Sequence, residues 1–148
     1  MIRLAALLLA ALLASTASAQ STTRFSADTP VVNFRLPMFN AAGHRAWLVR
    51  GSEARILSKE EIDIRELTMT LFAGDATERI ETMILSPVAR VYPEKSLATG
   101  NESIRVLDDR FEAAGLEWTY VHGDHEKRLT IAKQVRVSFR AQVDDILK

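Results

Sequence analysis

The 148-residue chain contains no cysteine, and its formal net charge is zero, from 19 basic and 19 acidic residues. Without cysteine there is no disulfide, no iron–sulfur cluster, no thiolate zinc site and no lipid-bearing residue of a lipoprotein. The balanced charge argues against binding to nucleic acid, which needs a basic face. Motifs for a serine nucleophile, a zinc protease or a phosphate loop are also missing. The composition therefore offers no sign of a reaction centre.

The amino terminus is typical of a secretory signal. Arg3 precedes an apolar run over residues 4–14, and Ala17 and Ala19 form the A-x-A pattern of a cleavage site. The run is shorter than the roughly 20 residues that span a bilayer. We predict a signal peptide over residues 1–19 and export, whereas a retained segment would act as a membrane anchor. Residues 20–30 are polar and predict a flexible leader, and residues 141–148 form a tail.

Residues 31–140 alternate between apolar and polar side chains, the period of a strand with one covered face. Turn signals recur about every 8–12 residues. The pattern predicts an all-β fold, an elongated antiparallel sandwich or jelly roll of at least eight strands with an apolar slot between its sheets. The apolar positions expected to line this slot are Leu67, Met69, Leu71, Ile104, Val106, Leu116, Trp118, Tyr120, Ile131, Val137 and Phe139.

Local signals place the turns and the edges of the predicted sheet. Pro30 and Pro37 cannot donate ladder hydrogen bonds, so a strand over residues 31–40 must lie at an edge. A strand break is expected at Gly51-Ser52, and Gly115 is expected to start a strand. Turns are predicted at residues 40–43, 58–61, 74–76, 108–109 and 123–126. Residues 58–61 also fit a helix capping box, and residues 79–85 fit either a helix or a strand.

Some polar clusters have a chemical interpretation beside a structural one. His122, Asp124 and His125 could contribute to a metal site, but a hairpin loop explains them better. The pairs at residues 108–109 and 144–145 could be catalytic carboxylates, although neighbours on a strand point to opposite faces. Trp118 and Tyr120 either stack on sugar rings or pack in the core. No metal, cofactor or catalytic residue is predicted.

Three sequence words resemble a known family. The first is "NAAGHRAWLVRGSEARI" with its x-G-x-x-x-W stretch. The second, "ILSPVARVYPEKSLATGNESIRVLDD", is similar to the family's middle, where a small-residue strand leads to a Gly-led V-x-V strand. The third is "GLEWTYVHGDHEKRLTIAKQVRVSF" with an aromatic strand, a charged turn and a last V-x-V strand. Together they resemble the periplasmic lipopolysaccharide-transport proteins of the LptC/LptA (OstA-like) family over residues 34–139. One departure concerns the amino terminus, since LptC-type members usually keep an inner-membrane anchor whereas this segment looks cleavable.

The resemblance implies a periplasmic, non-enzymatic protein of outer-membrane biogenesis. It would bind lipopolysaccharide by its acyl chains in the β-slot and hand it on between the inner and the outer membrane. Its partners would be other β-jelly-roll transport proteins joined by edge-strand pairing, and possible contact with an inner-membrane transporter complex follows from the same likeness. The expected partner edge is the last strand, with Val135, Arg136, Val137, Ser138 and Phe139.

Two other function classes stay open from sequence. A secreted β-sandwich module that binds carbohydrate or protein would carry Trp47, Trp118 and Tyr120 on its surface. A small hydrolase would need His122, His125 and Asp108 to meet in one pocket. The positions of these side chains in the fold distinguish the two alternatives from a lipid carrier.

Overall fold

The computed structural model describes residues 29–140, which form one antiparallel sheet and a single 3-10 turn. The predicted signal peptide, most of the leader and the tail lie outside the described residues. Alternating sequence gives long strands, most of them 11 to 13 residues. The elements are β1 (Val31–Phe39), β2 (Arg45–Ile56), β3 (Ile62–Phe72), β4 (Ile80–Tyr92), η1 (Pro93–Lys95), β5 (Leu97–Asp108), β6 (Phe111–His122) and β7 (Lys127–Phe139).

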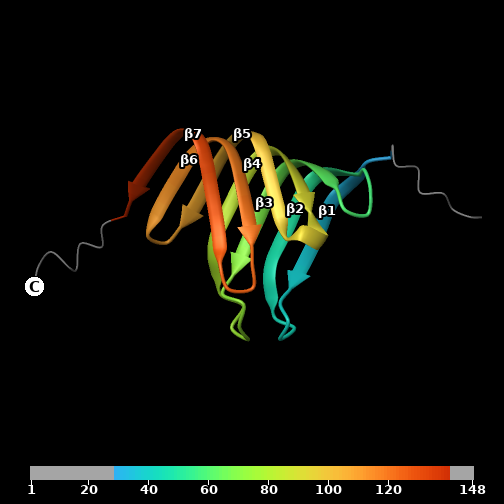
Figure 1. The fold of residues 1–148 in the computed structure, drawn as a ribbon, viewed down its shortest axis with the longest axis horizontal. Coiled ribbons are helices and arrows are strands. Elements are labelled where there is room, and N and C mark those ends of the chain that lie inside the picture. Colours follow the sequence, from blue (N-terminus) through green and yellow to red (C-terminus); the bar gives the residue numbers. More distant parts are fainter. Residues whose placement is uncertain (1–28, 141–148) are drawn as a thin grey trace, which may run out of the picture.

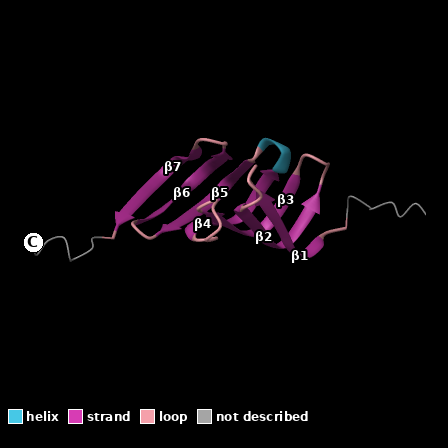
Figure 2. Ribbon diagram, turned by 90° about the horizontal axis from the view of Figure 1, so that it is seen from below, coloured by secondary structure: helices cyan, strands magenta, loops and turns pink. Residues whose placement is uncertain are grey.

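The seven strands lie in the sheet in the order of the sequence, each antiparallel to the next. The sheet runs from β1 at one end of the molecule to β7 at the other (Figures 1 and 2). Both end strands have a hydrogen-bonded neighbour on one side only, so β1 and β7 are open edges. The prediction of an all-β fold is confirmed, and so is the edge position of the strand that contains Pro37.

A line of irregularities crosses the middle of the sheet, and we call it the crease. Ladder pairing is interrupted beside Ser52, and its register shifts beside Pro87, Asn101 and Gly115. Four non-glycine residues in mid-strand adopt left-handed backbone angles, with φ between 50° and 56°: Asn33, Glu66, Glu117 and Gln134. An extra residue bends a strand and turns its later side chains to the other face. The buried alternation accordingly changes phase, from Ile64 to Leu67 for example.

The crease divides the sheet into two leaves that face each other. Leaf 1 comprises residues 34–39, 45–50, 67–72, 80–86, 103–108, 111–116 and 135–139. Leaf 2 comprises residues 53–56, 62–65, 88–92, 97–100, 118–122 and 127–133. Contacts between them join strands far apart in the sheet: Trp47 of β2 packs edge-on against Tyr120 of β6, with ring centroids 6.1 Å apart. The change of direction midway along β7 is visible in Figure 1.

The hydrophobic core fills the space between the leaves and draws on β2 to β6, with side chains of β1 and β7 packed around it. Close approach at the crease leaves no room for some side chains. A Cβ on Gly51 would lie 2.4 Å from Cγ2 of Ile64, and one on Gly100 would lie 2.3 Å from Nε1 of Trp118. Glycine is therefore required at both points by the close packing of neighbouring strands beside the crease.

Several local expectations need correction. The count of at least eight strands is wrong for the described residues, which contain seven. Gly51-Ser52 does not end a strand, because β2 continues through it as part of the crease, and Gly115 lies inside β6. Residues 80–92 form a strand and not a helix. The turns predicted around residues 40–43, 58–61, 74–76, 108–109 and 123–126 are confirmed.

Candidate functional site: the apolar interior and its open ends

Seven of the predicted slot residues lie between the leaves. They are 5% exposed or less, and they come from β3, β5 and β6: Leu67, Met69, Leu71, Ile104, Val106, Trp118 and Tyr120. Ile131 of β7 is partly buried and packs against this cluster. The interior is thus continuous and apolar, and in this conformation the protein's own side chains occupy it.

Leu116 does not belong to this group, contrary to the sequence pattern. It pairs with Ser103, while the inward-facing Ile104 pairs with Gly115, and paired residues share a face of the sheet. The left-handed backbone of Glu117 separates Leu116 from Trp118 and reverses the alternation between them. Leu116 therefore lies on the outer face of leaf 1, half-exposed.

Trp118 combines burial with a satisfied polar group. Its indole Nε1 donates to Ser86 Oγ at 3.2 Å, and this hydroxyl lies 2.8 Å from the carbonyl oxygen of Ser103. Ser86 itself is 4% exposed. The chain connects β6, β4 and β5 through the core, so the one polar atom of the ring has a fixed partner.

At the tips of the leaves, opposite the crease, lies a cleft of ≈ 800 Å³. It lies beside the β1–β2, β3–β4 and β6–β7 loops, which come together at the bottom of Figure 1. Lys127 of leaf 2 spans the tips, with Nζ 3.1 Å from the carbonyl oxygen of Phe72 and 3.0 Å from Oε2 of Glu81, both in leaf 1. This clasp and the Trp47–Tyr120 contact hold the leaves together at the mouth.

His122 lies inside this mouth. Its Nδ1 is 2.8 Å from the hydroxyl of Tyr120, and its ring is nearly parallel to that of Trp47, with centroids 6.1 Å apart. Burial, together with the positive charge of Lys127, lowers the pKa of His122 against an opposing effect of Asp124. Burial, with the negative charge of Glu81, raises the pKa of Tyr120. Both side chains are therefore neutral near pH 7.

The inner face is uncovered at the end formed by β7. Val137 pairs with the buried Ala113, and Phe139 pairs with Phe111, so both side chains are on the inner side of the sheet. They are nevertheless 48% and 79% exposed. The apolar surface of the interior thus continues out to the β7 edge, where no strand of the described chain covers it.

The backbone of β7 is also available at this edge. The N–H of Arg140 donates to the carbonyl of Arg110 at 2.8 Å, which makes Phe111–Phe139 a non-hydrogen-bonded pair. Because pair types alternate along an antiparallel ladder, Ala113–Val137 is of the same type, and Glu112–Ser138 is hydrogen-bonded. The N–H and C=O groups of Val137 therefore point outward, away from β6.

The residues of the other sites considered from the sequence do not form those sites in the described part of the chain. Trp47, Trp118 and Tyr120 are 2% exposed or less, so none offers a platform for a sugar ring. His122 and His125 line the mouth cleft, but Asp108 does not; it lies at the β5–β6 hairpin, hydrogen-bonded to Thr82 and Arg110. Within residues 29–140, no group of three or more histidine, aspartate or glutamate side chains is arranged to hold a metal ion. The pair at residues 144–145 lies outside the described residues.

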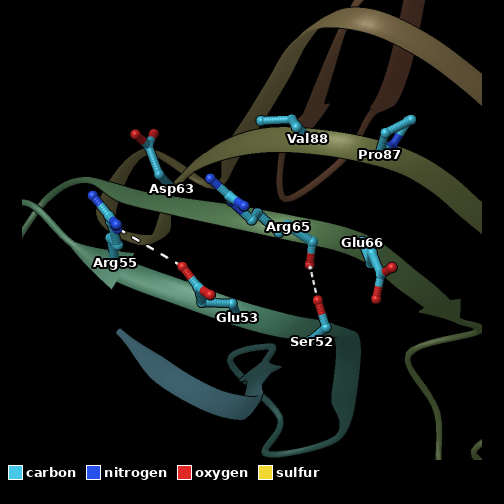
Figure 3. Close-up of a pocket in the computed structure, with 8 residues that line it drawn as sticks. All are labelled: Ser52, Glu53, Arg55, Asp63, Arg65, Glu66, Pro87 and Val88. Atoms are coloured by element: carbon cyan, nitrogen blue, oxygen red, sulfur yellow. Dashed lines mark hydrogen bonds and ion pairs between the residues drawn. The ribbon is translucent and has the colours of Figure 1, made fainter. Parts of the chain in front are cut away.

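A second hollow, of ≈ 580 Å³, lies on the outer face of leaf 2 beside the crease (Figure 3). It is lined by both signs of charge, with Arg55 and Arg65 beside Glu53 and Asp63. Arg55 Nε lies 3.8 Å from Oε1 of Glu53, and Ser52 Oγ lies 3.4 Å from the carbonyl oxygen of Arg65. The charges of these groups compensate one another.

The chain matches no protein-family model, and no curated protein matches it. Among residues 29–140 there is no helix with the length and apolar character needed to cross a membrane.

Sequence reasoning missed two parts of this site. The crease follows from left-handed residues such as Glu66 and Glu117, which are not residue types that favour that conformation. The mouth cleft depends on which loops meet after the sheet folds. One signal was available in the sequence, because the apolar positions change phase within single strands, from Ile64 to Leu67 in β3 for instance.

Proposed function

We propose that the protein is a lipid carrier of the LptC/LptA type, which binds the acyl chains of lipopolysaccharide against its apolar inner face and passes the lipid on without turnover. In this proposal the seven-stranded sheet of the described residues would act as the jelly roll expected for such a carrier. Its place would be the periplasm, after removal of the signal peptide. Neighbouring β-jelly-roll proteins would pair with an open edge strand of the sheet.

The observation that carries the proposal is the uncovered inner face at β7. Val137 and Phe139 extend the interior surface into solvent, next to outward-pointing backbone groups. Exposed apolar side chains beside an unpaired edge favour a partner or a lipid at that place. Covering these side chains would remove apolar surface from water, which stabilises a complex by about 25 cal/mol per Å² of buried surface.

The packed interior sets how lipid enters. Met69, Val106 and Trp118 are 2% exposed or less, so an acyl chain reaches them only if the leaves move apart. The bonds that resist this movement are the Lys127 clasp and the aromatic contacts at the mouth. Acyl chains would bind first at the uncovered β7 end and then extend toward Val106.

A crosslinking series tests the proposal. A photo-reactive residue is placed at Phe139 at the open end, at Met69 or Val106 in the interior, and at the outward-facing Thr119 as the control. Each variant is exposed to labelled lipopolysaccharide. We expect strong crosslinks at Phe139, weaker ones at Met69 and Val106, and none at Thr119.

Two results would contradict the carrier function. Equal labelling at Thr119 and Phe139 would indicate nonspecific adsorption. No crosslink at Phe139, Met69 or Val106 in a folded protein would exclude lipid on the inner face, and a module that binds protein through its edge strand would then be the better account.

A further inference from the structure

The outer face of leaf 1 carries a row of arginines that crosses the whole sheet. Consecutive ladder partners from β1 to β7 form this arginine row, in the order Arg35, Arg50, Thr68, Leu85, Arg105, Ala114 and Arg136. All four arginines are exposed. With strands about 4.8 Å apart, the row is about 29 Å long.

The charge of this row is mostly uncompensated. Arg105 Nε lies 2.6 Å from Oε1 of Glu112, but within residues 29–140 no carboxylate forms an ion pair with Arg35, Arg50 or Arg136. Arg35 and Arg50 are direct cross-strand partners, an arrangement of like charges that destabilises a sheet. An anion bound from outside the protein would relieve this repulsion.

The matching face of leaf 2 is different. Its ladder row reads Arg55, Asp63, Arg90, Thr99, Thr119 and Thr130. Here Arg90 binds both Asp63 and Glu61, with Nη1 2.6 Å from Oε1 of Glu61. The cross-strand pair of like charges therefore belongs to leaf 1, whereas on leaf 2 Arg55 has Asp63 as its ladder partner and Arg65 has Glu53.

Apolar side chains accompany the arginine row. The neighbouring ladder row reads Pro37, Leu48, Thr70, Met83, Leu107, Glu112 and Ser138. Beside Leu85, Arg105 and Ala114 the face has a hollow of ≈ 410 Å³, whose accessible surface is mostly apolar although polar side chains such as Thr68 also line it. The outer face of leaf 1 is thus basic and apolar together.

We propose that the outer face of leaf 1 docks on the surface of an anionic phospholipid bilayer. Each guanidinium would bind lipid phosphates through paired hydrogen bonds, and Leu85 and Met83 would face the upper acyl region. This function is separate from lipid carriage on the inner face, which uses the opposite side of the same strands.

The geometry favours a membrane over a single small anion or an acidic protein. Guanidinium groups spread over about 29 Å cannot share one small ligand. Lipid headgroups diffuse laterally, so they can meet both the close Arg35–Arg50 pair and the isolated Arg136. The hollow next to Arg105 accepts aliphatic groups, which a purely acidic surface does not provide.

The test measures binding of the full chain to vesicles. Vesicles of phosphatidylcholine with phosphatidylglycerol are compared with pure phosphatidylcholine, by co-sedimentation at low and at high salt. Arg35→Ser with Arg50→Ser removes two charges from leaf 1. Arg55→Ser with Arg128→Ser removes two charges from leaf 2 and is the matched control, with the same net charge and the same amino-terminal segment.

We expect the wild type to prefer the anionic vesicles and to lose this preference at high salt. The leaf 1 variant should bind anionic vesicles about 30-fold more weakly, which is about 2 kcal/mol for two basic residues at such a surface. The leaf 2 variant should bind within about two-fold of the wild type, because its arginines are compensated by carboxylates and lie on the other leaf.

Three results would overturn the proposal. Equal losses in the two variants would show that only net charge matters. No preference of the wild type for anionic vesicles would exclude a membrane. Binding to soluble polyglutamate with the same dependence on Arg35 and Arg50, and as tightly as to vesicles, would assign the face to an acidic protein.

Discussion

The two leaves are made from the same strands, yet the charged side chains on their outer faces are arranged differently. On leaf 2, Arg90 is held by Asp63 and Glu61, and threonines continue the row. On leaf 1, Arg35 and Arg50 stand side by side, with apolar neighbours. Because the crease reverses the alternation, each half of a strand presents its own set of residues. A meander folded across its strands can therefore evolve its two outer faces separately.

The difference between the leaves depends first on the packing at the crease. Gly100→Val should disrupt this packing, because even a Cβ at this position would lie 2.3 Å from Trp118 Nε1. We expect a loss of about 3 kcal/mol or more in the free energy of unfolding, measured by denaturant titration. Thr99→Val, one residue away on the outer face, should change it by less than about 0.5 kcal/mol. Similar stabilities for the two variants would contradict the close packing at the crease.

Proline substitutions distinguish the N–H groups of β7 that bond to β6 from those that point outward. Ser138→Pro removes an N–H that bonds to β6 and should cost about 1–3 kcal/mol. Val137→Pro removes an outward N–H, so it should weaken the fold far less while abolishing capture of partner proteins. Chemical denaturation and pull-down of partners check the two effects. Unchanged capture by Val137→Pro would exclude this edge as the partner strand.

Charge substitutions compare the leaves directly. Arg90→Ala on leaf 2 should destabilise the fold by no more than about 1 kcal/mol, since its side chain is 43% exposed. Arg35→Glu on leaf 1 should instead stabilise it by about 0.2–1 kcal/mol, because it turns a like-charge pair with Arg50 into an attractive one. Thermal unfolding at low salt gives both values. Destabilisation by Arg35→Glu would show that Arg35 has a structural partner.

The smallest expected effect concerns pH and the mouth. Because the pKa of His122 is lowered in the fold, the unfolded chain binds more protons near pH 6 than the folded chain does. Stability should therefore be complete above the ordinary histidine pKa of about 6.5 and fall as the pH decreases below it. His122→Gln should flatten this decrease between pH 7.5 and 5.5 in denaturant titrations. An identical slope in the variant would contradict a buried neutral imidazole.

Period-two alternation was enough to predict the all-β class, turn-forming residues predicted the hairpin turns, and Pro37 predicted the edge position of β1. It also placed Met69, Val106 and Trp118 on the inner face, because each lies within a regular stretch of strand. It failed at Leu116, where the backbone of Glu117 changes the phase. Residue type carries no signal for a left-handed glutamate, so the crease leaves only a change of phase in the sequence, and the strand count and the separation into leaves follow from the folded chain.

The odd number of strands has a consequence for assembly. Seven consecutive antiparallel strands leave β1 and β7 running in the same direction. Copies related by a simple translation, with β7 of one beside β1 of the next, would therefore pair in parallel and form an open-ended filament. An antiparallel junction between the same two edges would need each copy to be turned by 180° about the stacking direction, which would place the inner face of one copy beside the outer face of the next. A row of copies with a continuous inner face would therefore be joined by parallel strands.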